Sequence, residues 1–233
     1  MNCSAVCFDV GNTLLRPFPG VASVCHEVIT SMGHSCELDD IEAMMPLVDA
    51  HYEDAYSRDD SFWADEAATV EIWTGMYSML GRRLGLGSES DVFAKKVFDE
   101  FGLEGRWEPF EDVLPALDRL ASRGVRMAVI SNWDSRLEGL LQTMGLTRYF
   151  ETVISSAVVG LCKPDPRIFE LACDRLGVAS KEVAHVGDHH YADVVGASSA
   201  GLRPVLIDRT GTHRTQSRIT SLDCLEAHLG GSP

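Results

Sequence analysis

The sequence predicts an α/β fold, in which the strands of a parallel sheet alternate with helices and one all-helical segment is inserted. Short apolar runs rich in β-branched residues recur along the chain, with amphipathic helical patterns between them. This alternation stops between residues 16 and 107, where only helical patterns occur. The 233 residues, 45% hydrophobic and 24% charged, are typical of a globular protein with a sizeable core.

Each predicted strand is a short apolar run that ends in a polar residue. The first covers residues 4–9, ends in Asp9 and precedes the turn residues Gly11 and Asn12. The same pattern predicts strands at residues 125–132, 152–155, 183–188 and 204–208.

Three helix signals lie between these strands. Apolar residues at helical spacing predict a helix over residues 112–123. Ser135 and Glu138 form a capping-box pattern, which predicts that a helix begins at Ser135. Asp165 and Pro166 predict a cap followed by proline in the first helical position. Residues 210–220 are polar and predict a surface loop.

The segment 16–107 predicts four helices, near residues 20–32, 38–57, 65–84 and 88–101, and no strand. We therefore expect two domains: an α/β core of residues 1–15 and 108–233, and an inserted helical domain of residues 16–107. Trp63, Trp73 and Tyr77 are expected in the core of the inserted domain, with Phe62 and Trp63 as the alternative lining of a substrate pocket.

The composition disfavours several classes of partner. The net charge is −15, so phosphate backbones and anionic membrane surfaces would repel the chain. Seven scattered cysteines without a CxxC pair predict free thiols in a reducing compartment. No signal-peptide pattern and no membrane-length apolar run are seen, so we expect a cytoplasmic protein.

Chemically suited side chains stand at the ends of the predicted strands. Ligands of open parallel sheets bind beyond the carboxyl ends of the strands, which selects Asp9, Ser131 with Asn132, and Asp188. Two carboxylates brought together need a cation or a raised pKa, and oxygen ligands suit Mg²⁺. Lys163 could neutralise a phosphate, although a loop lysine is more often solvated, and a strand-terminal Asp more often caps a turn.

Four strings, in order, resemble the motifs of the haloacid dehalogenase superfamily. They are FDVGNTLL at 8–15, VISN at 129–132, KPDPRIF at 163–169 and VGDHHYADVVGASSAG at 186–201. The resemblance implies a Rossmann-like core, and the segment between the first two motifs resembles the helical C1-type cap of the family.

The resemblance also implies a role for each matching residue. Asp9 would be the nucleophile that forms a covalent aspartyl intermediate. Asp9, Asp188 and the backbone carbonyl of Gly11 would hold Mg²⁺, and Asp193 would either join them at the metal site or support its ligands from behind. Ser131 and Lys163 would hold the transferring phosphoryl group, with Asn132 as a further contact. The implied partner is a small phosphorylated substrate, and the implied assembly is a monomer or a homodimer.

Gly11 departs from the phosphatase pattern of this family. Its phosphatases carry an aspartate there, which protonates the leaving group, and glycine has no proton to give. Three explanations stay open. The chain is a phosphatase with another proton source, such as His189, His190, a side chain of the helical segment, or water. It catalyses another reaction of the family, such as the dehalogenase reaction. It binds a phosphorylated ligand with weak or no catalysis. We expect the first.

Overall fold

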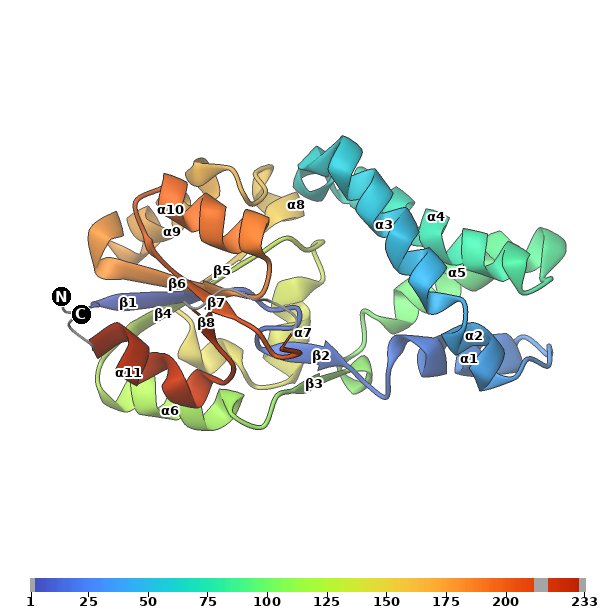
Figure 1. The fold of residues 1–233 in the computed structure, drawn as a ribbon, viewed down its shortest axis with the longest axis horizontal. Helices are drawn as coiled ribbons and strands as arrows, with labels where there is room; N and C mark the ends of the chain where they lie inside the picture. The colour runs from blue at the N-terminus through green and yellow to red at the C-terminus, as the bar shows by residue number, and fades with distance from the viewer. Residues whose placement is uncertain (1–2, 212–217, 231–233) are drawn as a thin grey trace.

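The computed structural model describes residues 3–211 and 218–230. Within them, six parallel strands form one sheet in the order β5-β4-β1-β6-β7-β8 (Figure 1). The strands are β1 (Ala5–Phe8), β4 (Arg126–Ser131), β5 (Thr152–Ser155), β6 (Val183–Gly187), β7 (Arg203–Ile207) and β8 (Arg218–Ile219). Because all six run in one direction, their carboxyl ends lie at one edge of the sheet.

Helices cover both faces of this sheet (Figure 1). They are α6 (Val113–Ser122), α7 (Leu137–Thr143), α8 (Ser156–Val159), α9 (Pro166–Leu176), α10 (Gly196–Ser199) and α11 (Leu225–Gly230). The central strand β1 is fully buried because its alternate side chains face two apolar clusters. Val6 and Phe8 pack in the cluster that contains α6, α7 and α11, while Ala5 and Cys7 pack in the one that contains α9 and α10.

The predicted α/β class and all five predicted strands are confirmed. The expected loop at 210–220 is only partly right: residues 212–217 lie outside the described residues, and Arg218–Ile219 forms β8. A two-residue strand is too short to show an alternating pattern, and β8 forms because Ile219 is buried opposite Ile207 on β7.

One helix start is confirmed and another is wrong. Pro166 opens α9, and the Asp165 side chain accepts a hydrogen bond from the Arg167 amide at 2.9 Å. By contrast, α7 begins at Leu137, not at Ser135. The Ser135 hydroxyl and amide both donate to the Glu66 carboxylate, at 2.7 and 2.8 Å. A carboxylate far away in sequence therefore replaces the local capping box.

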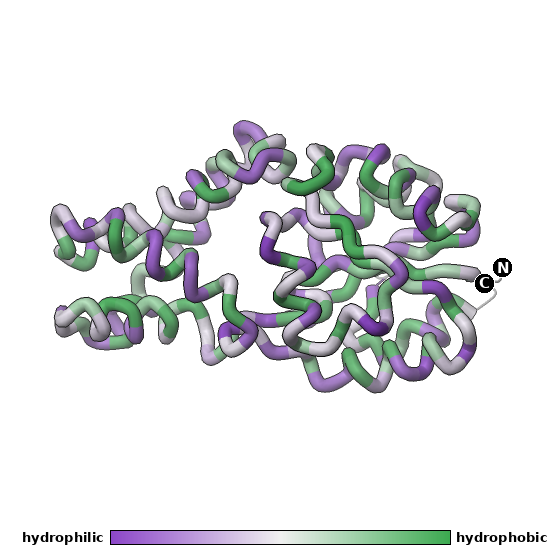
Figure 2. Tube along the Cα trace, turned by 180° about the vertical axis from the view of Figure 1, so that it is seen from behind, coloured by the Kyte–Doolittle hydropathy of each residue, from purple (hydrophilic) through white to green (hydrophobic). Residues whose placement is uncertain are grey.

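The helical segment is attached through a two-stranded antiparallel ladder of β2 (Leu15–Pro17) and β3 (Trp107–Pro109). We call residues 18–106, which lie between these strands, the helical insertion. Its helices are α1 (Val21–Ser31), α2 (Leu38–Glu42), α3 (Met45–Arg58), α4 (Glu66–Arg83) and α5 (Ser90–Glu100). Figure 2 shows hydrophobic and hydrophilic residues alternating along them, as expected for helices that pack on one side.

Two expectations for this segment need correction. The single helix expected over residues 38–57 is two, because α2 ends at Glu42 and α3 begins at Met45. The expected absence of strands fails at both ends, where β2 and β3 pair. The predicted domain boundaries fall inside these strands, and the division into two domains stays a prediction. Among the described residues, no helix combines the length and apolar character needed to span a membrane.

Candidate active site

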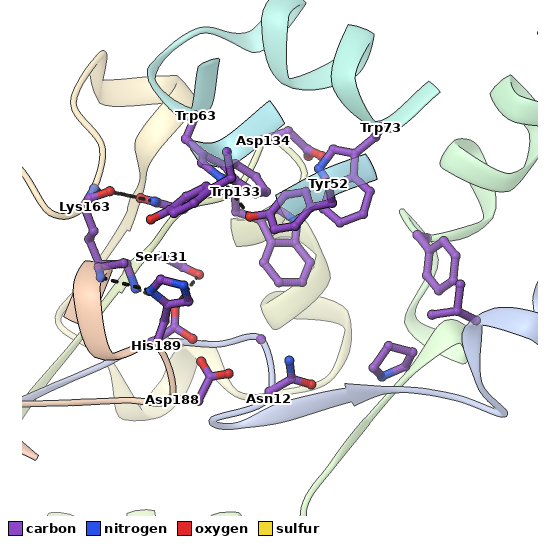
Figure 3. Close-up of a pocket in the computed structure, with 18 of the residues that line it drawn as sticks. Asn12, Tyr52, Trp63, Trp73, Ser131, Trp133, Asp134, Lys163, Asp188 and His189 are labelled. Atoms are coloured by element: carbon purple, nitrogen blue, oxygen red, sulfur yellow. Dashed lines mark hydrogen bonds and ion pairs between the residues drawn. The ribbon is translucent and has the colours of Figure 1, made fainter. Parts of the chain in front are cut away.

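The carboxyl ends of β1, β4 and β6 open into a pocket of about 460 Å³ between the sheet and the helical insertion (Figure 3). Its lining contains all of the residues predicted as nucleophile, phosphate contacts or metal ligands: Asp9, Gly11, Ser131, Asn132, Lys163, Asp188 and Asp193. These residues come from separate strands and loops, and the parallel sheet brings them to one edge.

Lys163 lies at the centre of a buried network. Its ammonium group donates to Asp9 Oδ1 at 2.7 Å and to Asp193 Oδ1 at 2.6 Å, and only 2% of the residue is exposed. Burial favours the neutral amine, but the two carboxylates outweigh it and raise the pKa of Lys163. Ser131 Oγ also donates to Asp9 Oδ1, at 2.9 Å. The network thus holds one oxygen of Asp9 in a fixed position.

Asp193 is held from three sides. Besides Lys163, it accepts from His185 Nε2 at 2.8 Å and from the His189 amide at 2.9 Å. Burial opposes ionisation, but the Lys163 charge and the His185 hydrogen bond outweigh it and lower the pKa of Asp193. A Cβ on Gly187 would lie 2.1 Å from Asp193 Cγ, so this close approach requires glycine.

Three carboxylates form a candidate metal centre. One oxygen from each of Asp9, Asp188 and Asp193 lies within 4.8 Å of the others. Burial, together with the charges of the other two carboxylates, raises the pKa of Asp188 to about 8. A divalent cation would relieve this repulsion, and an all-oxygen donor set suits a hard ion such as Mg²⁺. The residues present therefore fit such an ion, with Gly11 lining the same pocket.

Asn132 is bonded to the backbone of Lys163, and its predicted phosphate contact stays a prediction. Its side-chain amide donates to the Lys163 carbonyl at 2.9 Å and accepts from the Lys163 amide at 2.8 Å. A Cβ on Gly196 would also lie 2.9 Å from Pro164 Cα, so helix α10 packs closely on the same loop. Asn132 therefore positions the backbone that carries Lys163.

The two histidines proposed as proton donors differ in their position relative to the pocket. His189 lines the pocket, and its Nδ1 accepts from the Ala192 amide at 3.0 Å, which places the proton of a neutral ring on Nε2. His190 is exposed and lies outside the pocket lining. A Cβ on Gly11 would lie 3.7 Å from Trp133 Cζ3, which is an ordinary van der Waals contact.

Sequence reasoning missed three polar residues of the site. His185 is fully buried within β6, and the sequence offers no signal for its contact with Asp193. Asp134 and Arg136 form an ion pair with Nη2–Oδ2 at 2.6 Å, and the guanidinium lies 3.7 Å from the centroid of the Phe98 ring. The polar string after Ser131 could have suggested this pair, but its partner Phe98 belongs to the distant insertion.

Comparisons with known proteins cover most of the chain. A family model described as haloacid dehalogenase-like hydrolase matches residues 3–201. The haloacid dehalogenase-like hydrolase domain-containing protein 3 of Danio rerio is 34% identical over 165 residues, covering 67% of this chain and 68% of that protein. The phosphoserine phosphatase of Thermus thermophilus is 30% identical over 227 residues, covering 86% of this chain and 87% of that protein.

Other similarities point to two chemistries. The (S)-2-haloacid dehalogenase 4A of Burkholderia cepacia is 37% identical over 137 residues, covering 54% of this chain and 59% of that enzyme. Among solved structures, a HAD phosphatase from Thermococcus onnurineus matches with a TM-score of 0.67 and 26% identity, covering 100% of this chain and 99% of that one. Similarity therefore supports the fold and the hydrolase class, while the residues of the site must distinguish the reactions.

Proposed function

This chain belongs to the haloacid dehalogenase-like hydrolases, and on that basis we propose that it is a Mg²⁺-dependent phosphatase of a small phosphorylated metabolite. The observation that carries the proposal is the buried arrangement in which Lys163 bridges Asp9 and Asp193 while Asp188 lies beside them. Phosphoryl transfer needs a nucleophile, a fixed cation and a site for a second cation, and these residues supply all three.

Asp9 is the proposed nucleophile. The hydrogen bonds that Ser131 and Lys163 donate to it both go to Oδ1, which leaves Oδ2 for attack on phosphorus. The bond between phosphorus and the leaving oxygen breaks as the bond to Asp9 forms, and water then releases phosphate from the aspartyl intermediate. Ser131 and Lys163 stand beside the reacting carboxylate, where they can also hold the oxygens of the phosphoryl group.

Asp9, Asp188, Asp193 and the carbonyl of Gly11 are the proposed holders of the metal ion. When bound, a divalent ion neutralises the negative charge of the phosphoryl group and of the carboxylates. Without it, a dianionic phosphate would meet three acids and one lysine. This charge balance supports a metal requirement.

The helical insertion is proposed to act as a cap over this site, as a domain inserted into the α/β core. It contributes Tyr52, Trp63 and Trp73 to the pocket wall, opposite the carboxylates. We propose a cytoplasmic protein that works as a monomer or a homodimer.

Hydrolysis of acetyl phosphate tests the proposed phosphatase function. Its leaving group is a small acetate, so the result does not depend on how the pocket recognises a larger leaving group. We expect phosphate release that requires Mg²⁺ and falls at least about a thousandfold in Asp9→Asn, because the nucleophile is lost. Asp174→Asn, which alters an exposed acid on α9, is the matched control and should behave like the parent. Equal release by the parent and Asp9→Asn would contradict the proposal.

The dehalogenase alternative rests on the similarity to the Burkholderia enzyme. Displacement of halide by a carboxylate needs no metal ion, whereas this site keeps a triad of acids suited to one. Halide release from a 2-haloacid, with no phosphate release from acetyl phosphate, would favour that alternative. A protein that binds inorganic phosphate with Mg²⁺ but turns over neither compound would be a binding protein.

A further inference from the structure

The pocket collects the aromatic side chains of the chain. Nine of its 24 lining residues are aromatic, and the whole sequence has 4 Trp, 5 Tyr and 9 Phe. All four tryptophans line it: Trp63, Trp73, Trp107 and Trp133. The gathering of all four tryptophans in one pocket indicates a surface that recognises a ligand, as well as a core.

The rings form a wall with fixed orientations. Tyr52 and Trp73 stack with centroids 5.7 Å apart, and Trp63 meets Trp73 edge to face at 5.9 Å. Trp63 Nε1 donates to the Tyr52 hydroxyl at 3.3 Å, and burial raises the pKa of Tyr52 to about 12, so the wall is uncharged at neutral pH. Figure 3 shows Tyr52, Trp63, Trp73 and Trp133 gathered together, away from Asp188 and His189.

Almost none of the acidic side chains of the helical insertion lie in the pocket lining beside the aromatic wall. Residues 16–107 hold 18 acidic and 7 basic side chains, yet Glu53 is the one charged residue that this segment contributes to the described pocket lining. The expectation that Trp63, Trp73 and Tyr77 belong to the core of the insertion is therefore incomplete, because all three also line the pocket.

The described lining offers no uncommitted cation to a second anionic group. Lys163 is bonded to Asp9 and Asp193. Arg136 is paired with Asp134, donates to the Phe98 carbonyl at 2.5 Å and stacks on the Phe98 ring. A carboxylate or second phosphate on the ligand would meet Glu53 and aromatic rings, so it would lose its hydration without gaining a partner.

We propose that this pocket selects phosphate monoesters of an uncharged aromatic alcohol, an inference that rests on the phosphatase function proposed above. The ring of the leaving group stacks on the aromatic wall while its phosphate lies at Asp9. Phosphorus passes to Asp9 Oδ2, and the aryl oxygen departs with the electron pair of its bond and takes a proton from water. A phenol has a pKa of about 10, so its oxyanion leaves without being protonated by a side chain at position 11, where this chain has glycine.

Phosphonates separate recognition from turnover, because their carbon–phosphorus bond is not cleaved here. Quenching of fluorescence from the four pocket tryptophans reports binding in the presence of Mg²⁺, with or without catalysis. We expect phenylphosphonate to bind at least about tenfold more tightly than both methylphosphonate and 4-carboxyphenylphosphonate. Equal affinities would overturn the proposal and leave the phosphatase function standing, since acetyl phosphate tests that function independently.

Two variants test the wall itself. Trp73→Leu should reduce the preference for phenylphosphonate over methylphosphonate by about tenfold. Trp73 also packs within the insertion, so its replacement changes the packing there as well as the wall. The exposed residue Glu53 therefore supplies a second test. Glu53→Lys should reverse the discrimination against 4-carboxyphenylphosphonate, while Glu71→Lys, an exposed acid outside the pocket, should not. An unchanged carboxylate preference in Glu53→Lys would contradict the proposed charge selection.

Discussion

Gly11 shows how one missing side chain changes what a site can do. It lies in the pocket beside Asp9, and a Cβ there would be in ordinary contact with Trp133. The metal-binding carbonyl proposed for this position needs no side chain, so the loss concerns only proton transfer. Esters of alkyl alcohols need that proton most, because their oxyanions are poor leaving groups.

Replacing Gly11 with aspartate should therefore restore an acid where there is room for one. We expect Gly11→Asp to raise kcat/KM for an alkyl phosphate about 10- to 100-fold and to change an aryl phosphate far less. Gly11→Asn is the matched control, since it adds similar volume without an acidic proton for the leaving group. No gain in a folded, Mg²⁺-binding Gly11→Asp protein would count against this explanation.

Asp188 couples metal binding to pH. Its pKa without metal is raised from the ordinary 3.8 to about 8, so near pH 7 the carboxyl holds a proton that Mg²⁺ must displace. A raised acid pKa means that ionisation weakens the folded state. The free energy of unfolding without metal should accordingly fall as pH rises from about 4 to 8.

Calorimetric titration with Mg²⁺ checks this coupling. At pH 7, two buffers of different ionisation enthalpy should reveal release of about one proton per ion bound, and affinity should rise up to about pH 8. In Asp188→Asn both the proton release and most of the affinity should be lost. Tight binding by the parent with identical heats in both buffers would show that Asp188 is already ionised.

Among the elements, α4 and the loop after β4 are joined by Ser135 and Glu66. Glu66 is the first residue of α4, and its carboxylate accepts both hydrogen bonds from Ser135. The same loop follows Ser131, the last residue of β4, which bonds to Asp9. The start of an insertion helix is thus linked to the loop that positions the proposed nucleophile.

A double-mutant cycle measures this link. Ser135→Ala removes only the hydroxyl bond and should lower the free energy of unfolding by about 1 kcal/mol, whereas Glu66→Ala removes both bonds and should cost about 1–2 kcal/mol. The double variant should lose little more than Glu66→Ala alone. Glu71→Ala, on the same helix, should add independently to Ser135→Ala. Fully additive losses for Ser135 and Glu66 would show that the two residues are not coupled in solution.

At the scale of the whole molecule, the acidic residues of the helical insertion lie mostly outside the pocket that its aromatic residues line. The sheet carries an apolar cluster on each face, and the helical insertion has a further one of its own. Residues of the insertion and of the carboxyl edge of the sheet line the pocket together, and Figure 1 shows these two parts facing each other. There the insertion presents mostly rings, while nearly all of its acids lie elsewhere.

The sequence by itself determined five of the strands of the parallel sheet, their alternation with helices and the residues of the carboxylate network. These depend on local patterns: an apolar run followed by a polar residue marks a strand end, and Asp165 with Pro166 marks a helix start. Motif resemblance then connected Asp9, Lys163, Asp188 and Asp193, which the structure brings together.

Only the tertiary structure decided which residues act on one another across long separations. It formed hydrogen bonds from Ser135 to Glu66, between His185 and Asp193, and from the Asn132 side chain to the Lys163 backbone. It also paired β2 with β3. It also brought four scattered tryptophans to one pocket. Periodicity assigns a side chain to a face of its own element, but the partner of that face depends on how distant elements pack, which no local pattern records.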